Sequence, residues 1–211
     1  MNPPTHDELD TALSLRHTPE VHERIKAARV GIAGLGGLGS NIAAMLVRSG
    51  IGDITIADHD SVDISNINRQ NYSLDQIGIK KTDATEHVLK RINPYIRITK
   101  YDVRIDPDNA SDIFGDVDIV CEAFDVPSEK AMLINTILEK CPDVKVISGS
   151  GMAGFGRSNS ITTKKVFENL YMCGDGVDME DVKGGLMSPR VNICAGHMAN
   201  AVIAILMKGE L

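Results

Sequence analysis

The sequence predicts one α/β domain built on a mainly parallel sheet with helices on both faces. Short apolar runs of the kind that form buried parallel strands alternate along the chain with longer helical segments. The chain has 211 residues, of which 43% are apolar and 24% charged, and this is the size and composition of a soluble globular domain. We therefore expect residues 1–211 to form a single domain.

The expected elements follow in order from the N-terminus. Residues 1–27 are polar and rich in charge, and we expect a helical segment there. Strands are expected over 29–33, 53–57, 96–103, 117–121 and 144–147, and helices over 42–47, 80–92, 107–114, 128–140 and 191–207. Residues 151–190, rich in Gly, Asp, Ser and Lys, are expected to form a mobile loop region before the last helix. The alternation of strand and helix predicts parallel pairing through right-handed crossovers.

A glycine-rich turn separates the first expected strand from the first apolar helix. Gly34, Gly36 and Gly39 fit the pattern G-x-G-x-x-G, with Gly37 between them. Glycines permit a tight turn and let backbone N–H groups approach a phosphate at the start of a helix. Asp58 ends the second strand about 20 residues further on, where an acid accepts hydrogen bonds from ribose hydroxyls. This order predicts a nucleotide site on a Rossmann-like sheet, but it fits ATP and NAD equally.

Motifs beyond this turn favour ATP. Asp58 and Asp60 form an acidic pair after the second strand. The further motifs are S-N-I-N-R-Q at 65–70, G-I-K-K at 78–81, R-I-N-P at 91–94, E-A-F-D at 122–125 and G-L-M-S-P at 185–189. Through these motifs the chain, over about residues 21–208, resembles the ThiF/MoeB/HesA family of ubiquitin-activating-enzyme-like adenylyltransferases. It is most similar to a short ThiF-type sulfur carrier protein adenylyltransferase.

The resemblance implies an enzyme that uses ATP to adenylate the C-terminal glycine of a ubiquitin-like sulfur carrier ending in Gly-Gly. Pyrophosphate is released, and thiamine biosynthesis is the expected pathway. The implied ATP-binding residues are Gly34, Gly36, Gly37, Gly39, Asp58, Asp60, Asn66, Arg69, Gln70 and Lys81. Catalytic roles fall to Arg69, Lys81 and Asp125, with Asp125 as the Mg²⁺ ligand. The resemblance also implies a homodimer in which Arg16 enters the partner's phosphate site; the alternative is that Arg16 is an exposed helix charge.

The chemistry of these side chains agrees with the implied reaction. A peptide C-terminal carboxylate is already ionised at pH 7, so its attack on the α-phosphorus of ATP needs no general base. The reaction needs positive charge and a metal around the phosphates. Arg69 offers a planar fork of donors and Lys81 a point charge. Asp125 offers hard oxygen ligands for Mg²⁺, although the same carboxylate is also suited to cap the helix that follows it.

The cysteines argue against a metal-bound or disulfide-linked scaffold. Cys121, Cys141, Cys173 and Cys194 contain no C-x-x-C pair, so we expect no zinc. Cys173, which we expect in a loop, is a candidate for a covalent link with the carrier, although the acidic residues over 175–181 disfavour its thiolate. Cys121 and Cys194 lie in apolar runs and are expected in the core.

Other functions stay open on the sequence alone. They are adenylation of a molybdopterin-synthase-like carrier, of another carboxyl group or of a modified tRNA base, an NAD-dependent oxidoreductase, and a non-catalytic binding module. The net charge of −7 argues against nucleic acid as the partner. The N-terminus lacks a signal-peptide pattern, and Asn192, His197 and Asn200 interrupt the last apolar stretch, so we expect a cytoplasmic protein without a membrane span.

Overall fold

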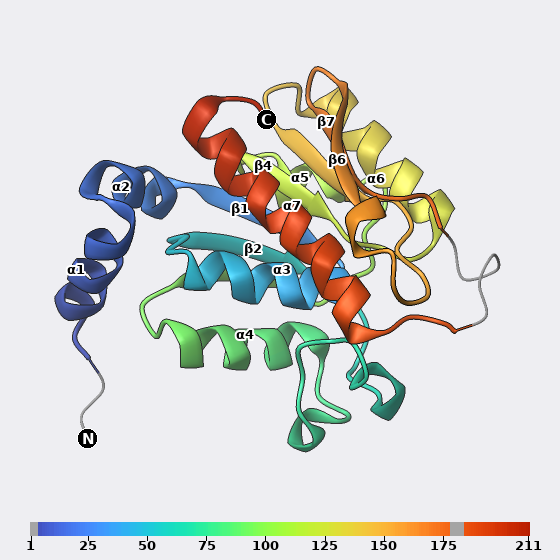
Figure 1. The fold of residues 1–211 in the computed structure, drawn as a ribbon, viewed down its shortest axis with the longest axis horizontal. Helices are drawn as coiled ribbons and strands as arrows, with labels where there is room; N and C mark the ends of the chain where they lie inside the picture. The colour runs from blue at the N-terminus through green and yellow to red at the C-terminus, as the bar shows by residue number, and fades with distance from the viewer. Residues whose placement is uncertain (1–3, 178–183) are drawn as a thin grey trace.

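The computed structural model describes residues 4–177 and 184–211, and in this part of the chain a seven-stranded sheet is flanked by helices (Figure 1). The strands are β1 (Arg29–Ala33), β2 (Asp53–Ala57), β3 (Arg97–Tyr101), β4 (Ile119–Glu122), β5 (Lys145–Gly149), β6 (Thr162–Phe167) and β7 (Leu170–Gly174). Their order across the sheet is β3-β2-β1-β4-β5-β7-β6, and all neighbours are parallel except the antiparallel pair β6 and β7. The predicted α/β fold with a mainly parallel, Rossmann-like sheet is confirmed.

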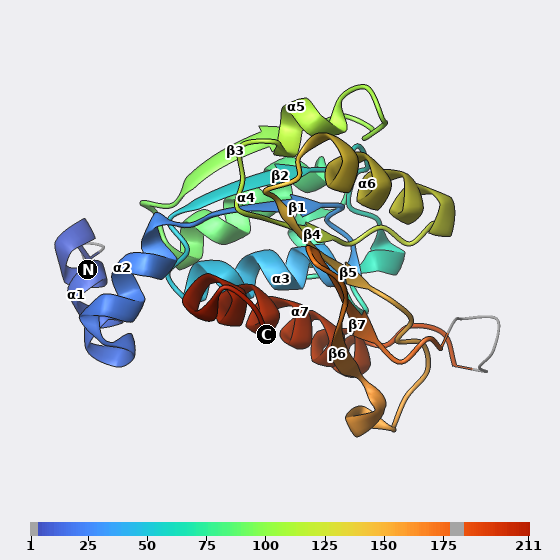
Figure 2. The same cartoon turned by 90° about the horizontal axis from the view of Figure 1, so that it is seen from above.

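Seven α-helices surround this sheet in the part of the chain that the structure describes. They are α1 (His6–His17), α2 (Pro19–Ala27), α3 (Gly37–Arg48), α4 (Lys81–Ile92), α5 (Ala110–Phe114), α6 (Pro127–Lys140) and α7 (Ser188–Lys208). Short 3₁₀ turns are η1 (Ile64–Asn66), η2 (Leu74–Gln76) and η3 (Ser158–Ser160). Helices α3, α4 and α7 cover one face and α5 and α6 the other (Figure 2). The crossovers from β1 to β2, β2 to β3, β3 to β4 and β4 to β5 each place a helix on the sheet, as the alternating pattern predicts, whereas β5 is joined to its parallel neighbour β7 through η3 and β6.

Each face of the sheet has its own apolar core. On one side Ile42 and Leu46 of α3 are fully buried together with Met198 and Val202 of α7. On the other side Phe114 is fully buried against residues of α6. By length and composition α7 is apolar enough to cross a membrane, but it packs on α3 and on the sheet and is therefore a core helix.

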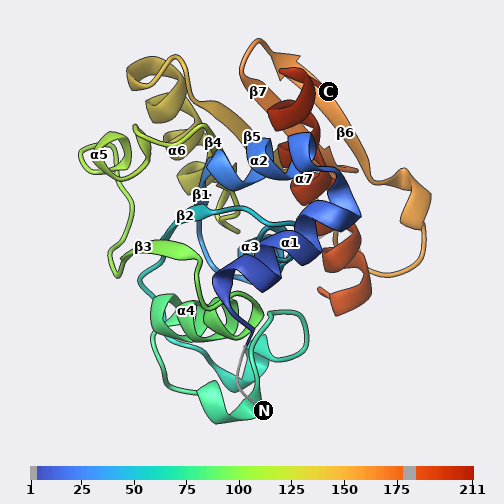
Figure 3. The ribbon, with the colours of Figure 1, turned by 90° about the vertical axis from the view of Figure 1, so that its left-hand side faces the viewer.

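The N-terminal helices lie at the edge of the sheet where β1 and β2 begin (Figure 3). Within the segment 1–27, which was expected to be helical, the helices span His6–His17 and Pro19–Ala27. Side chains of both helices reach Gly50, next to the start of β2: the nearest atoms to a Cβ built there belong to His22 and Leu13. The helices thus lie at the amino-terminal ends of the strands. Ligands bind in open α/β sheets at the other end, beyond the carboxyl ends of the strands.

The expectation of a mobile loop over 151–190 is wrong for residues 162–174. These residues form the hairpin β6–β7, and β7 extends the parallel part of the sheet by pairing with β5. Leu170, Tyr171 and Cys173 are buried, whereas Thr162 and Lys164 lie on the exposed edge strand, which accounts for the polar composition of the region. Of the range 151–190, residues 178–183 lie outside the described residues.

Candidate functional site

The glycine turn joins the carboxyl end of β1 to the start of α3. Gly34 has φ +87°, a left-handed conformation that favours glycine, and its N–H donates to the Ala57 carbonyl at 2.9 Å. A Cβ on Gly39 would lie 1.8 Å from the carbonyl oxygen of Gly34, so only glycine fits there. Among the residues that the structure describes, the atom nearest to a Cβ on Gly36 would lie 3.9 Å away. The first and last glycines therefore form the turn, and the middle one leaves its backbone open to a ligand.

The start of α3 has the properties of an anion site. Its N-cap residue is Gly36, and no side chain of the described residues caps the helix. The N–H groups of the first turn are consequently available to a phosphate, and the helix dipole favours negative charge there.

Asp58 anchors the turn from the end of β2. Its Oδ2 atom accepts a hydrogen bond from the N–H of Leu35 at 2.6 Å, and its Oδ1 atom accepts one from the N–H of Asp60 at 2.8 Å. The residue is 8% exposed. Because each carboxylate oxygen can accept more than one hydrogen bond, the same carboxylate can shape the turn and also receive ribose hydroxyls.

Lys81, the first residue of α4, carries its charge into this site. Its Nζ atom lies 2.7 Å from Asp60 Oδ2 and 4.0 Å from Asp58 Oδ2, and the residue is only 6% exposed. Burial by itself raises the pKa of Asp60, but the hydrogen bond from Lys81 and the charges of Lys81, His59 and Lys80 outweigh it and lower that pKa. Lys80 points elsewhere, toward the His59 carbonyl and the Asp102 carboxylate. Of the two lysines, Lys81 is the one at the site.

Arg69 and Gln70 cover the other side of the glycine turn. The Arg69 side chain lies beside Gly37, where an added Cβ would be 3.4 Å from Arg69 Cγ, and its Nη1 donates to Ser65 O at 3.1 Å. Asn41 of α3 holds this segment by donating to the Arg69 carbonyl at 2.9 Å. One guanidinium edge is thus fixed by the chain, and the remaining donors are available to a ligand.

Gln70 brings an unpaired acceptor to the same place. It is 7% exposed, and its Nε2 atom is the atom nearest to a Cβ built on Gly36. Within the described residues its Oε1 atom is buried without a hydrogen-bond partner. Buried polar atoms are normally paired, so this acceptor near the glycine turn has the capacity to accept one N–H or O–H donor.

Asn66 has a local structural role as well as its expected ligand role. Its Oδ1 atom accepts from the N–H of Asp63 at 3.0 Å and closes the η1 turn. The Nδ2 group is the end of this side chain that remains as a donor to a ligand. The structure does not bring Asn66 into hydrogen-bond contact with the other predicted site residues through its side chain, among the parts of the chain described.

Asp125 lies beside the glycine turn at the next strand end. It follows β4, and the residues before it pack on Gly34: a Cβ there would lie 3.0 Å from Phe124 Cδ1 and 3.2 Å from the Ala123 oxygen. The Asp125 side chain is exposed, and no hydrogen bond or ion pair to its carboxylate occurs within 4–177 and 184–211. A free carboxylate at this edge fits a Mg²⁺ ion, which is usually held by one or two carboxylates together with phosphate and water.

Sequence reasoning missed Glu122, the last residue of β4. It is fully buried, and its carboxylate contacts Lys130 and Ser148. The available signal was an acidic residue ending an apolar strand, V-D-I-V-C-E, where a charge is buried only if it is paired.

Arg16 is not brought to this site within one chain. It is exposed on α1, which lies with α2 on the side where β1 begins, whereas the glycine turn follows the carboxyl end of β1. Helix α1 is held there by Asp10, whose carboxylate lies 2.8 Å from His22 Nε2 and 2.9 Å from Lys26 Nζ.

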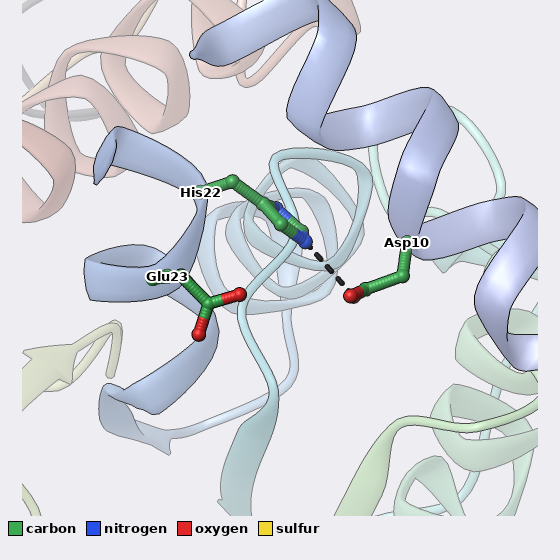
Figure 4. A group of neighbouring side chains, drawn as sticks. All are labelled: Asp10, His22 and Glu23. Atoms are coloured by element: carbon green, nitrogen blue, oxygen red, sulfur yellow. Dashed lines mark hydrogen bonds and ion pairs between the residues drawn. The ribbon is translucent and has the colours of Figure 1, made fainter. Parts of the chain in front are cut away.

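Figure 4 shows that Glu23 also lies near Asp10 and His22, a combination of side chains that suits a metal ion. The Lys26 ammonium already occupies one oxygen of Asp10, however, and its hydrogen bond is the main reason that the pKa of Asp10 is lowered. We therefore describe this group as an ion-pair network that fastens α1 to α2.

Cys173 does not lie in a loop, as the sequence had suggested, but in β7. It is fully buried, and burial raises the pKa of its thiol to about 11 despite a hydrogen bond with Thr163. Such a thiol is a weak nucleophile at neutral pH. Cys121 and Cys194 are buried, as predicted. Part of the acidic stretch at 175–181, from 178 on, lies outside the described residues.

The chain is similar to a known protein family and to several known proteins. Residues 10–210 match the ThiF family. The chain is 32% identical over 194 residues to the adenylyltransferase and sulfurtransferase UBA4 of Candida glabrata, covering 87% of this chain and 43% of that protein. It is 31% identical over 194 residues to the molybdopterin-synthase adenylyltransferase of Salmonella typhimurium, covering 89% and 76%. The chain thus spans less than half the length of the UBA4 relative.

Solved structures share the fold. The E. coli tRNA N6-threonylcarbamoyladenosine dehydratase TcdA in complex with ATP has a TM-score of 0.83 at 21% identity, covering 94% of this chain and 93% of that one. E. coli MccB with ATP has a TM-score of 0.68 at 24% identity, covering 89% and 58%. With the match over residues 10–210 and two curated relatives above 30% identity, the chain belongs to the ThiF family.

Proposed function

We propose that this protein is an ATP-dependent adenylyltransferase that activates the C-terminal glycine of a ubiquitin-like sulfur carrier. The observation that carries the proposal is the position of Lys81. Its buried ammonium lies 4.0 Å from the same Asp58 oxygen that accepts the Leu35 N–H of the glycine turn, so a positive charge faces a turn built to receive phosphates. The names of the two curated relatives, both adenylyltransferases, support the same activity.

The proposed reaction is a single displacement at phosphorus. A carboxylate oxygen of the carrier bonds to the α-phosphorus of ATP, the bond from that phosphorus to the bridging oxygen breaks, and pyrophosphate leaves with the electron pair. No proton is transferred, because the carboxylate is ionised at pH 7. This agrees with a site in which the functional side chains are cations, hydrogen-bonding groups and carboxylates.

Each residue has a defined task in this scheme. The open backbone at Gly36 and the N–H groups of α3 hold the phosphates, and Asp58 receives the ribose hydroxyls. Lys81 and Arg69 stabilise negative charge that grows on the phosphate oxygens as the bond breaks. Asp125 would hold a Mg²⁺ ion together with the phosphates, and the ion would supply further neutralisation of negative charge on the leaving group.

The test is ATP–pyrophosphate exchange with purified carriers that end in Gly-Gly. The carrier of thiamine biosynthesis is our first candidate, and the carrier of molybdopterin synthase is the second because of the Salmonella relative. Exchange that requires the terminal glycine, with a carrier lacking it as the control, is the expected result. Tight binding of NAD with no binding of ATP would favour an oxidoreductase and contradict the proposal. Binding of ATP without exchange for any carrier would restrict the activity to another carboxyl substrate.

We also propose that two copies of the chain act together, with Arg16 of each entering the phosphate site of the other. Arg16 is exposed on α1, on the side of the sheet where β1 begins, and its own glycine turn lies at the other end of β1, which supports action across a dimer. The test mixes Arg16→Ala protein with Lys81→Ala protein. Each is expected to be inactive alone, whereas a mixed dimer has one site that combines an intact Lys81 with an intact Arg16. Absence of any regained exchange in dimers shown to be mixed contradicts the proposal.

A further inference from the structure

Glu122 is a buried carboxylate that the proposed chemistry does not use. It is 0% exposed, and in the sheet register it lies opposite Ala33 of β1 and Ser148 of β5. Its Oε1 atom accepts from the N–H of Phe124 at 2.7 Å. Its Oε2 atom accepts from Ser148 Oγ at 2.5 Å and lies 2.7 Å from Lys130 Nζ. Both oxygens are thus satisfied and the charge is paired, which is the condition for burying a carboxylate.

Glu122 and Lys130 hold the same peptide segment from two sides. The Phe124 N–H donates to Glu122, and the Phe124 carbonyl accepts from Lys130 Nζ at 3.1 Å. Lys130 lies in α6, which begins at Pro127, directly after the turn. The ion pair therefore fixes the backbone on both sides of the residue that precedes Asp125.

Asp125 depends on this backbone for its position. In the described chain no side chain or backbone group binds its carboxylate, so nothing except the turn itself orients it. The same turn packs on the glycine loop through the Phe124 ring, which lies 3.0 Å from the Cβ position of Gly34. A shift of the Phe124 peptide would therefore move Asp125 relative to the site of the phosphates.

We propose that Glu122 and Lys130 are positioning residues that hold Asp125 where it ligates the Mg²⁺ ion of bound ATP. The inference rests on the proposed function. Stability alone does not explain the pair, because replacing a buried ion pair by apolar residues of similar volume is often neutral or stabilising. The pair does what an apolar pair cannot do: it binds the N–H and the carbonyl of one peptide segment at the edge of the site.

The test uses Glu122→Met/Lys130→Met, which removes the acceptor of the Phe124 N–H and the donor to the Phe124 carbonyl, and measures ATP binding by calorimetry over a range of Mg²⁺ concentrations, without any carrier. Both charges are removed together so that neither is left buried and unpaired. ATP affinity without Mg²⁺ is expected to be unchanged. The Mg²⁺ concentration that gives half of the enhancement of ATP binding is expected to rise about 10- to 100-fold, as for other groups that orient metal ligands. Faster hydrogen exchange of the Phe124 N–H is the accompanying readout.

Glu129→Gln is the matched control, because Glu129 is the neighbour of Lys130 on α6 and pairs instead with Arg104, which is 70% exposed. Its Mg²⁺ dependence should equal that of wild type. If the double variant does not fold, Glu122→Asp replaces it, since the shorter side chain keeps the charge but withdraws from the Phe124 N–H. Wild-type Mg²⁺ dependence in the folded variant overturns the inference and leaves the proposed function intact. A wild-type protein that binds no ATP overturns the proposed function and the inference with it.

Discussion

Lys81 Nζ lies 2.7 Å from Asp60 Oδ2, so the first residue of α4 is tied to the segment that follows β2. The same ammonium lies 4.0 Å from Asp58 Oδ2, and both Lys81 and Asp58 are buried. Its positive charge therefore offsets the repulsion between the carboxylates of Asp58 and Asp60. We predict that Lys81→Met lowers the rate of ATP–pyrophosphate exchange by about 10²–10³, the usual cost of one preorganised charge at a transition state. The free energy of unfolding should fall as well, measured by urea titration.

The double variant Lys81→Met/Asp60→Asn separates the two effects. Removing the Asp60 charge relieves the repulsion, so the double variant should recover stability without recovering the exchange rate. Lys80→Met is the control, since Lys80 is exposed and pairs with Asp102 at 3.3 Å. Recovery of both stability and rate in the double variant would show that Lys81 acts only on the fold.

A second ion pair, between Arg190 and Asp175, is expected to make the stability of the fold depend on pH. Arg190 of α7 is 2% exposed and its guanidinium contacts the Asp175 carboxylate after β7. Burial by itself raises the pKa of Asp175, but hydrogen bonds from Ser160, Arg190 and the Val177 N–H together lower it below its ordinary value of 3.8. A depressed pKa in the folded state gives stability that is present above 3.8 and is lost as the pH falls through the folded value.

Asp175→Asn should therefore reduce the free energy of unfolding most at pH 7 and progressively less below pH ~4. The loss at pH 7 should reach up to about 3–5 kcal/mol, because the Arg190 charge is left buried. Asp53→Asn is the control, since Asp53 pairs with Arg97, which is 77% exposed, and should change stability by less than about 1 kcal/mol. Urea titrations of all three proteins over a range of pH provide the measurement. A pH-independent loss in Asp175→Asn would contradict the assignment.

The buried cysteines predict slow reaction with thiol reagents. All four are buried, and burial raises the pKa of the thiols of Cys141, of Cys173 to about 11 and of Cys194 to about 12. Iodoacetamide at pH 7.5 should label the native protein slowly and all four thiols rapidly in urea, as followed by mass spectrometry. Cys173→Ala should accordingly retain carrier adenylation. Rapid modification of Cys173 in the native protein would restore it as a candidate for a covalent link.

The fold was predictable where the signal is local in the chain. The apolar runs 29–33 and 53–57 coincide with β1 and β2, because a strand buried on both faces must be apolar at successive positions. The hairpin over 162–174 was not predicted, because the edge strand β6 is polar and charged. In the composition of the whole region, its residues outweigh the short apolar strand β7 that follows it. Composition averaged over a long range cannot reveal a strand of five residues.

The residues of the candidate site also fall into two groups, those that a local motif identifies and those whose role appears only in the folded chain. Lys81 and Asp125 follow from motifs, since each has a fixed place relative to a strand or helix end. The role of Glu122 depends on its register opposite Ser148 of β5 and on a lysine one helical turn into α6, neither of which is visible in the run V-D-I-V-C-E. The unpaired Oε1 atom of Gln70 likewise becomes apparent only once the glycine turn has folded against it.

Substitutions at Gly36 and Gly39 test separately how the turn keeps its conformation and how it binds ATP. Gly36 has φ −76° and ψ −148°, and within the described chain a Cβ there would meet no atom closer than 3.9 Å. Gly39 has no such room, because its Cβ would lie 1.8 Å from Gly34 O. We therefore expect Gly36→Ala to lower the melting temperature far less than Gly39→Ala does.

The substitution Gly36→Ala should weaken the binding of ATP. The methyl group of Gly36→Ala would stand on the open side of the turn, where the phosphates approach the backbone most closely. Forcing an extra methyl group into a close contact costs about 1–3 kcal/mol, which is roughly a tenfold to a hundredfold rise in Kd. Calorimetry with ATP and Mg²⁺ measures this change, and the melting temperature shows whether the turn is intact. If Gly36→Ala binds ATP as wild type does, the phosphates do not lie over the middle glycine, and the nucleotide must be placed elsewhere along the carboxyl edge of the sheet.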